Sequence, residues 1–183
     1  MNEESISEDL FSYNVGKVYE ALFGEKYIEE ESEVGKLTGL YYKSAFFEKA
    51  RSFLDEQSSE QEFCLVVVDI EHFKLFNEWH GREAGDRFLM DIATELNKIC
   101  NENNGIAGYL GDDDFVILVS RSRDLLEDLQ YNIIGRVREY EESAGFLPGF
   151  GVYFIEDRSI SINMMFDRAK IALAKIRGNY ARR

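Results

Sequence analysis

The stretch that decides the fold is FCLVVVDI, residues Phe63–Ile70, in which seven apolar residues surround one carboxylate. Its β-branched residues, with no polar alternation before Asp69, predict a strand that is buried on both faces. Within it, Phe63–Val68 is the longest unbroken apolar run of the chain and falls well short of the ~18 residues that a membrane-spanning helix needs. We therefore expect a domain built around an interior strand, with no membrane span in this segment.

Patterns of helices and strands surround this central strand. The expected elements are helices at about 44–57, 84–103, 124–143 and 162–177, and further strands at about 105–110, 115–120 and 149–155. Pro148 is expected just before the last strand, where it removes no ladder hydrogen bond. From residue 63 onward the order is strand, helix, strand, strand, helix, strand. This order predicts an α+β fold, a ferredoxin-like (palm-type) βαββαβ antiparallel sheet flanked by helices.

The predicted topology brings distant carboxylates to one edge of the sheet. Right-handed crossovers place the strand at 115–120 between the other two early strands and antiparallel to both. Asp69, at the end of the first strand, then lies beside Asp112–Asp114 in the turn that precedes residue 115. Such carboxylates suit Mg²⁺, which takes hard oxygen ligands. Asp is also common at strand ends and in turns for conformational reasons alone, so the pattern by itself decides nothing.

Charge and cysteine content exclude several classes of function. The chain has 183 residues with 35 acidic and 21 basic side chains, a formal net charge of −14. This charge disfavours nucleic-acid binding, because phosphates would be repelled. Cys64 and Cys100 show no metal-type spacing and are expected to be reduced structural thiols of a cytoplasmic protein.

The first 34 residues differ in composition from the rest. Residues 1–34 hold ten acidic and two basic side chains, and Phe11, Val15, Val18 and Leu22 recur there at helical spacing. We expect residues 1–34 to be an N-terminal helical appendage or linker and residues 35–183 to be the globular domain. The helix can pack on its own domain or on a second copy.

A series of motifs then identifies a family. The motifs are Leu37-Thr38-Gly39-Leu40, Asp69-Ile70-Glu71-His72-Phe73-Lys74, Asn77 with Gly81, Gly85 and Asp86, Leu110-Gly111-Asp112-Asp113-Asp114-Phe115, and Ala174-Lys175-Ile176-Arg177-Gly178. In order and spacing they resemble the GGDEF domain of diguanylate cyclases, which condense two GTP into cyclic di-GMP. The resemblance covers about residues 35–180.

The resemblance implies a metal site. By that resemblance Asp69, the backbone carbonyl of Ile70 and Asp113 would bind Mg²⁺. Asp69, Asp113 and Asp114 would be the catalytic candidates if the domain turns over substrate.

The resemblance also implies a nucleotide site. Asn77 and Asp86 would hydrogen-bond the guanine edge, whose mixed donors and acceptors an amide and a carboxylate can satisfy. Lys74 and Lys175 would approach the phosphates. Lys175 can equally be a cation that stabilises the end of a helix.

The departures from the family pattern fall mostly on the phosphate side. Gly35, Glu71, Arg82, Tyr109, Asp112, Asp114 and Asn179 stand where the family usually has Asp, Asp, His, Arg, Gly, Glu and Arg. Asp112 adds a Cβ and a negative charge where the nucleotide would approach. The family's feedback motif, Arg-x-x-Asp, is replaced by Glu102 and Gly105 at its two charged positions. These changes together indicate a degenerate active site.

Three functions follow from this sequence. The favoured one is a non-catalytic, regulatory GGDEF-like module that binds GTP and controls an attached or partner phosphodiesterase domain of the EAL type. The second is an active diguanylate cyclase, which would work as a homodimer because each subunit supplies one GTP. The third is a structural dimerisation module that uses the N-terminal helix.

Overall fold

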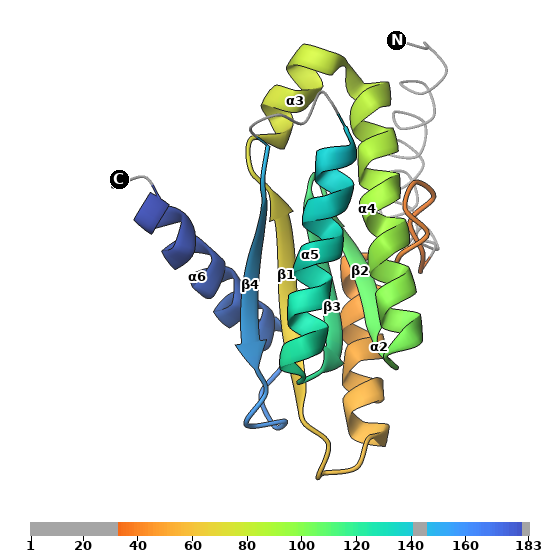
Figure 1. The fold of residues 1–183 in the computed structure, drawn as a ribbon. Coiled ribbons are helices and arrows are strands. Elements are labelled where there is room, and N and C mark those ends of the chain that lie inside the picture. The colour runs from red at the N-terminus through yellow and green to blue at the C-terminus, as the bar shows by residue number, and fades with distance from the viewer. Residues whose placement is uncertain (1–32, 141–145, 181–183) are drawn as a thin grey trace, which may run out of the picture. The chain divides into compact units, whose positions relative to one another are not determined.

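The computed structural model describes residues 33–140 and 146–180, all of which belong to one compact unit. The predicted helix with Phe11 and Leu22 lies outside the described residues, so the appendage and its boundary stay predictions. The elements in order are α2 (Lys43–Glu56), β1 (Phe63–Ile70), α3 (Phe73–His80), α4 (Arg82–Glu102), β2 (Ile106–Gly111), β3 (Asp114–Ser120), α5 (Arg123–Glu139), β4 (Pro148–Phe154) and α6 (Ile162–Tyr180) (Figure 1).

One four-stranded antiparallel sheet organises the domain, with strand order β2-β3-β1-β4. This order confirms the predicted βαββαβ topology and the place of β3 between β1 and β2. The register of β1 and β3 pairs Cys64 with Val119 and Val68 with Phe115. The end of β1 therefore meets the start of β3, as predicted from the connections.

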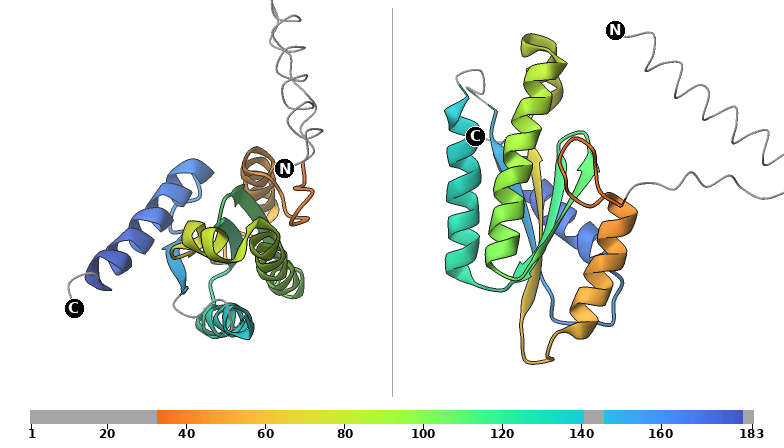
Figure 2. Two further views of the ribbon diagram at one scale, coloured as in Figure 1. Left: turned by 90° about the horizontal axis from the view of Figure 1, so that it is seen from above. Right: turned by 90° about the vertical axis from the view of Figure 1, so that its right-hand side faces the viewer.

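Each face of the sheet carries its own hydrophobic core, because successive strand residues point to opposite sides. Cys64, Val66 and Val68 pack in the core beneath α4 and α5. Leu65 and Val67 pack in the core beneath α2 and α6. The view from above shows α4 and α5 on one side of the sheet and α2 and α6 on the other (Figure 2).

Both cysteines are buried, in agreement with a structural role. Burial raises the pKa of each thiol to about 12, so neither forms a thiolate near neutral pH. Within the described part of the chain, no helix combines the length and apolar character that crossing a membrane requires.

The structure corrects two expectations of the sequence. The pattern does not predict α3, an eight-residue helix bounded by His72 at φ 62° and Gly81 at φ 84°. Its buried Phe73 and Phe76 stack with each other, with ring centroids 6.0 Å apart. Pro148 does not precede the last strand but opens it, opposite Ile70. Proline is tolerated as the first residue of an edge strand.

Gly151 brings α6 unusually close to the sheet. A Cβ built on this β4 residue would lie 2.1 Å from the backbone oxygen of Ala169 and 2.8 Å from Cβ of Leu173. Any larger residue would push the helix away. The contact fixes the height at which the middle of α6 crosses the sheet.

Candidate functional site

A cavity of about 530 Å³ lies between α3, α4 and the turn that joins β2 to β3. We call it the α3–α4 cavity. Four residues predicted from the sequence line it, namely Lys74, Asn77, Asp86 and Asp113. Its other lining residues are Phe73, Arg82, Leu89, Tyr109 and Asp112. Residues separated by up to 40 positions in the chain are thus gathered around one space.

Asn77 is held by the tight junction of α3 and α4. The backbone N–H of Gly81 donates to the carbonyl of Asn77 at 2.9 Å, and Gly81 then opens α4. A Cβ on Gly85 would lie 1.9 Å from Oδ1 of Asn77, so only glycine leaves room for this amide. That oxygen is buried and accepts no hydrogen bond from any described residue. A buried acceptor without a donor is costly, which makes it a candidate ligand contact.

Two cations at this cavity have no carboxylate partner among the residues that the structure describes. Lys74 and Arg82 line the space and form no ion pair within residues 33–140 and 146–180. Arg82 is the first residue of α4, where the family usually has histidine. Both side chains are exposed and so are available to an anionic ligand.

The turn between β2 and β3 tolerates the unusual aspartate. Gly111 has φ 101° and Asp112 has φ 53°, so both occupy the left-handed region. Asp and Asn adopt this region more readily than most other residues. The hydroxyl of Tyr109 donates to the backbone oxygen of Asp112 at 2.9 Å and braces the turn. Burial and the nearby Asp112 carboxylate raise the pKa of Tyr109 to about 12, which keeps this donor protonated.

Asp113 and Asp69 meet as the topology predicts. The Asp113 carboxyl hydrogen-bonds the Asp69 carboxyl and accepts from the backbone N–H of Ile70. Burial, followed by the charges of Asp69 and Asp114, raises the pKa of Asp113 to about 7. Two carboxyls in contact cannot both ionise cheaply, so the pair retains a proton close to neutral pH.

Asp114 takes no part in the cavity. Lys170 Nζ on α6 donates to Asp114 Oδ2 at 2.6 Å, while Oδ1 is buried without a partner among the described residues. No sequence pattern indicates this pair, because the two residues are 56 positions apart and meet only through the way α6 crosses the sheet. Lys175 is exposed on the same helix and does not line the cavity, so its phosphate contact stays a prediction.

The oxygen donors around Asp113 are of the type that Mg²⁺ prefers. Asp69 and Asp113 supply two carboxyls, and the backbone carbonyl of Ile70 is a third candidate. Within the part of the chain that the structure describes, no group of three or more acidic, histidine or cysteine side chains is placed to hold a metal ion. Binding of Mg²⁺ by these donors therefore stays a prediction.

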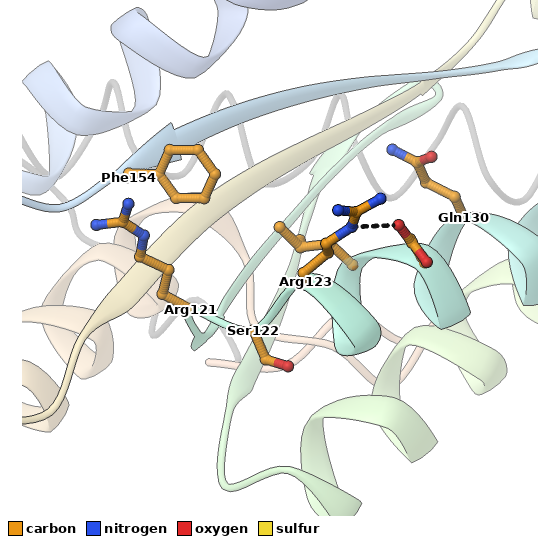
Figure 3. Close-up of a pocket in the computed structure, with 7 residues that line it drawn as sticks. Arg121, Ser122, Arg123, Gln130 and Phe154 are labelled. Carbon is orange, nitrogen blue, oxygen red and sulfur yellow. Dashed lines mark hydrogen bonds and ion pairs between the residues drawn. The ribbon is translucent and has the colours of Figure 1, made fainter.

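A second cavity, of about 400 Å³, lies between the N-terminal half of α5 and the ends of β3 and β4. We call it the α5 cavity. Arg121 lies over the ring of Phe154, 4.6 Å from its centroid, and reaches Glu62 at 3.4 Å. Arg123 pairs with Glu127 at 2.7 Å (Figure 3). The guanidinium groups here are already paired within the protein.

Comparisons with known proteins agree with this geometry. The family model described as "Diguanylate cyclase, GGDEF domain" matches residues 32–180. The diguanylate cyclase DgcP of Escherichia coli is 27% identical over 151 residues, which cover 78% of this chain and 44% of that protein. The diguanylate cyclase DgcP of Pseudomonas aeruginosa is 35% identical over 99 residues, covering 51% of this chain and 15% of that protein.

The fold matches as well. The crystal structure of the GGDEF domain of DgcB from Caulobacter crescentus, solved with c-di-GMP, superposes with a TM-score of 0.67 at 22% identity. The match covers 85% of this chain and 94% of that one. The chain spans less than half the length of the two curated relatives above.

Proposed function

The chain belongs to the GGDEF domain family of diguanylate cyclases, and from that premise we propose that it is a guanine-nucleotide-binding module of cyclic di-GMP signalling that does not turn over substrate. The observation that carries the proposal is a difference between the guanine side of the site and its phosphate and metal side. The guanine-side residues Asn77 and Asp86 line an open cavity with an unsatisfied acceptor. On the phosphate side Lys74 is available, but Asp112 replaces a glycine of the family pattern and Asp114 is paired with Lys170.

Guanine fits the unsatisfied acceptor. Its N1–H and exocyclic N2–H₂ are donors, and the Oδ1 atom of Asn77 and the Asp86 carboxylate are acceptors. Adenine has no donor at its N1 position and would leave a buried acceptor unpaired. Such a mismatch costs ~1–3 kcal/mol, so we propose a preference for GTP and GDP over ATP.

The side of the site where the phosphates would react is unfavourable for condensation of GTP. Asp112 lines the cavity with a carboxylate where the family has glycine, and it would repel a triphosphate. Asp114 is bound to Lys170. Asp113 and Asp69 are in contact with each other. None of the three side chains around the turn is poised to activate the attacking hydroxyl.

Mg²⁺ would supply charge neutralisation for the phosphates if it binds. We propose Asp69, Asp113 and the carbonyl of Ile70 as its protein ligands, with Lys74 and Lys175 as phosphate contacts. Lys74 lines the cavity and is available, whereas Lys175 would need the nucleotide to extend toward α6. The proposed role of the bound state is to regulate an attached or partner EAL-type domain or a second copy of this chain.

A titration tests the proposal. Calorimetry with GDP, GTP and ATP in the presence of Mg²⁺ should give weak binding of the two guanine nucleotides and none of ATP. Asn77→Ala should abolish the preference, while Gln130→Ala, in the α5 cavity, should leave it unchanged. No guanine nucleotide binding at millimolar concentration would contradict the proposal.

An active cyclase is the second candidate, favoured by the meeting of Asp69 and Asp113 at the predicted edge. Incubation with GTP and either Mg²⁺ or Mn²⁺, followed by chromatography for cyclic di-GMP, separates the two. We expect no product above background. Robust product formation would establish the cyclase instead.

A further inference from the structure

We propose that Lys170 is a built-in counter-ion for the acidic end of the sheet, supplying there the positive charge that a divalent cation would otherwise supply. The inference concerns the protein without nucleotide and does not depend on guanine binding. It makes the structure of the β2–β3 turn independent of metal.

The sheet register concentrates negative charge at this point. Val68 and Phe115 form the last pair of β1 and β3, and Asp69 and Asp114 are the residues next to that pair. Asp69 lies two residues after Val67, and Asp114 lies two residues before Val116. Because alternate strand residues share a face, both carboxylates belong to the face beneath α2 and α6. The Asp113 carboxyl hydrogen-bonds Asp69 and lies close enough to Asp114 for that charge to raise its pKa. Three carboxyls therefore share one small region.

Lys170 reaches this region from α6, one of the helices that cover the face of the sheet to which Asp114 belongs. Its Nζ lies 2.6 Å from Asp114 Oδ2, and the two side chains retain 41% and 27% of their exposed area. The ammonium also lies 5.4 Å from the ring centroid of Phe166, one helical turn earlier. Partial burial shields this pair from water and salt more than the surface pairs of the domain are shielded.

The reach of Lys170 depends on how closely α6 packs. The neighbouring residue Ala169 is the one whose backbone oxygen would lie 2.1 Å from a Cβ on Gly151. Glycine at this position of β4 thus lets α6 approach the sheet at the turn of helix that carries Lys170. The contact is a specific feature of this packing and not a chance encounter of two long surface side chains.

Removing the lysine should leave the carboxyls without compensation and open to an external cation. We expect Lys170→Met to unfold at a temperature several degrees lower than the wild type in metal-free buffer. Millimolar Mn²⁺ should restore at least half of that loss, whereas it should shift the wild type by less than about 1 °C, which corresponds to a few tenths of a kcal/mol for a protein of this size. Lys36→Met, at an exposed lysine that forms no ion pair with any described residue, is the control and should behave like the wild type.

A second variant separates charge from packing. Asp114→Asn combined with Lys170→Met removes both charges and should unfold near the wild-type temperature, with no response to Mn²⁺. The proposal is overturned if Mn²⁺ stabilises the wild type as much as Lys170→Met, or if Lys170→Met and Lys36→Met unfold alike. It is also overturned if the double variant is as unstable as Lys170→Met alone, because the loss would then come from packing. Nucleotide is absent throughout, so a failure here leaves the proposed function untouched.

Discussion

Two cavities among the described residues, the α3–α4 cavity of about 530 Å³ and the α5 cavity of about 400 Å³, differ in how completely their charged and polar side chains are paired. In the α3–α4 cavity, Lys74 and Arg82 have no ion-pair partner among the described residues and Asn77 Oδ1 is a buried acceptor without a donor. In the α5 cavity, Arg121 and Arg123 are each paired with a carboxylate of the same chain. Charge lining a hollow therefore does not by itself indicate a ligand. A buried polar group without a partner does indicate one, because its missing hydrogen bond can be supplied by a bound ligand.

The glycine that makes room for Asn77 gives the largest expected effect. A Cβ at Gly85 would lie 1.9 Å from Asn77 Oδ1, so Gly85→Ala should displace the amide and lower the free energy of unfolding by ~1–3 kcal/mol through overpacking. Guanine nucleotide binding should disappear with it. Denaturant unfolding and calorimetry measure the two effects.

The matched control for this change lies on α5, outside the lining of both cavities. Gly135 is also helical, but nothing lies within 4 Å of an added Cβ. Gly135→Ala should raise the free energy of unfolding by ~0.5–1 kcal/mol, because alanine loses less backbone freedom. If both variants are destabilised alike, the space around Asn77 is not what requires glycine at position 85.

The unpaired cations give the next largest effect. Lys74→Gln and Arg82→Gln should each weaken GTP binding about tenfold, the effect of ~1.4 kcal/mol for one lost charge-assisted hydrogen bond. GDP should be affected less if the cations contact the terminal phosphate. Arg121→Gln is the charge-matched control in the α5 cavity and should leave GTP affinity unchanged. An equal loss in all three variants would indicate a general effect of net charge.

The sequence predicted which residues gather at the α3–α4 cavity, while their roles toward guanine and phosphate stay predictions. The residues Lys74, Asn77 and Asp86 belong to one continuous segment, so local spacing is enough to place them together. The bounds of β1 were also predictable, because an interior strand is apolar on both faces and its sequence is therefore a continuous apolar run. The sequence did not predict α3, because eight residues make only about two turns and too few repeats of the apolar pattern to recognise.

The contacts that the sequence could not predict are long-range ones. Lys170 meets Asp114 only because Gly151 lets α6 settle onto β4. The hydroxyl of Tyr109 meets the Asp112 carbonyl only because the turn adopts left-handed backbone angles. Neither contact has a spacing rule, since each depends on the tertiary arrangement.

The pKa of Asp113 predicts a smaller effect with a defined dependence on pH. Its value of about 7 in the folded protein lies above the ordinary value of 3.8. The folded state therefore binds more protons between about pH 4 and pH 7, and this group's contribution to stability falls as the pH rises through that window. Asp113→Asn removes the ionisation, so the variant should gain ~1 kcal/mol relative to the wild type at pH 8, a figure reduced for the partial exposure of the carboxyl.

The comparison at pH 5 is the control for this prediction. There Asp113 is already protonated in the folded wild type, and asparagine should bring little gain. Denaturant unfolding at both pH values gives the difference. A gain of the same size at pH 5 and pH 8 would mean that something other than the ionisation of Asp113 destabilises the turn.

The smallest effect is expected for the paired arginines of the α5 cavity. Arg123 is 88% exposed in its side chain and Glu127 62%, so their 2.7 Å ion pair on the first turns of α5 is screened by water and salt. Exposed pairs four residues apart contribute only ~0.3–0.5 kcal/mol, and Arg123→Gln should change the free energy of unfolding by no more than that. Guanine nucleotide affinity should stay at the wild-type value, which calorimetry can check on the same preparation. A large loss of stability, or a tenfold change in affinity, would show that paired charges can mark a ligand site as well as unpaired ones. The distinction between the two cavities would then have to rest on the buried acceptor of Asn77 alone.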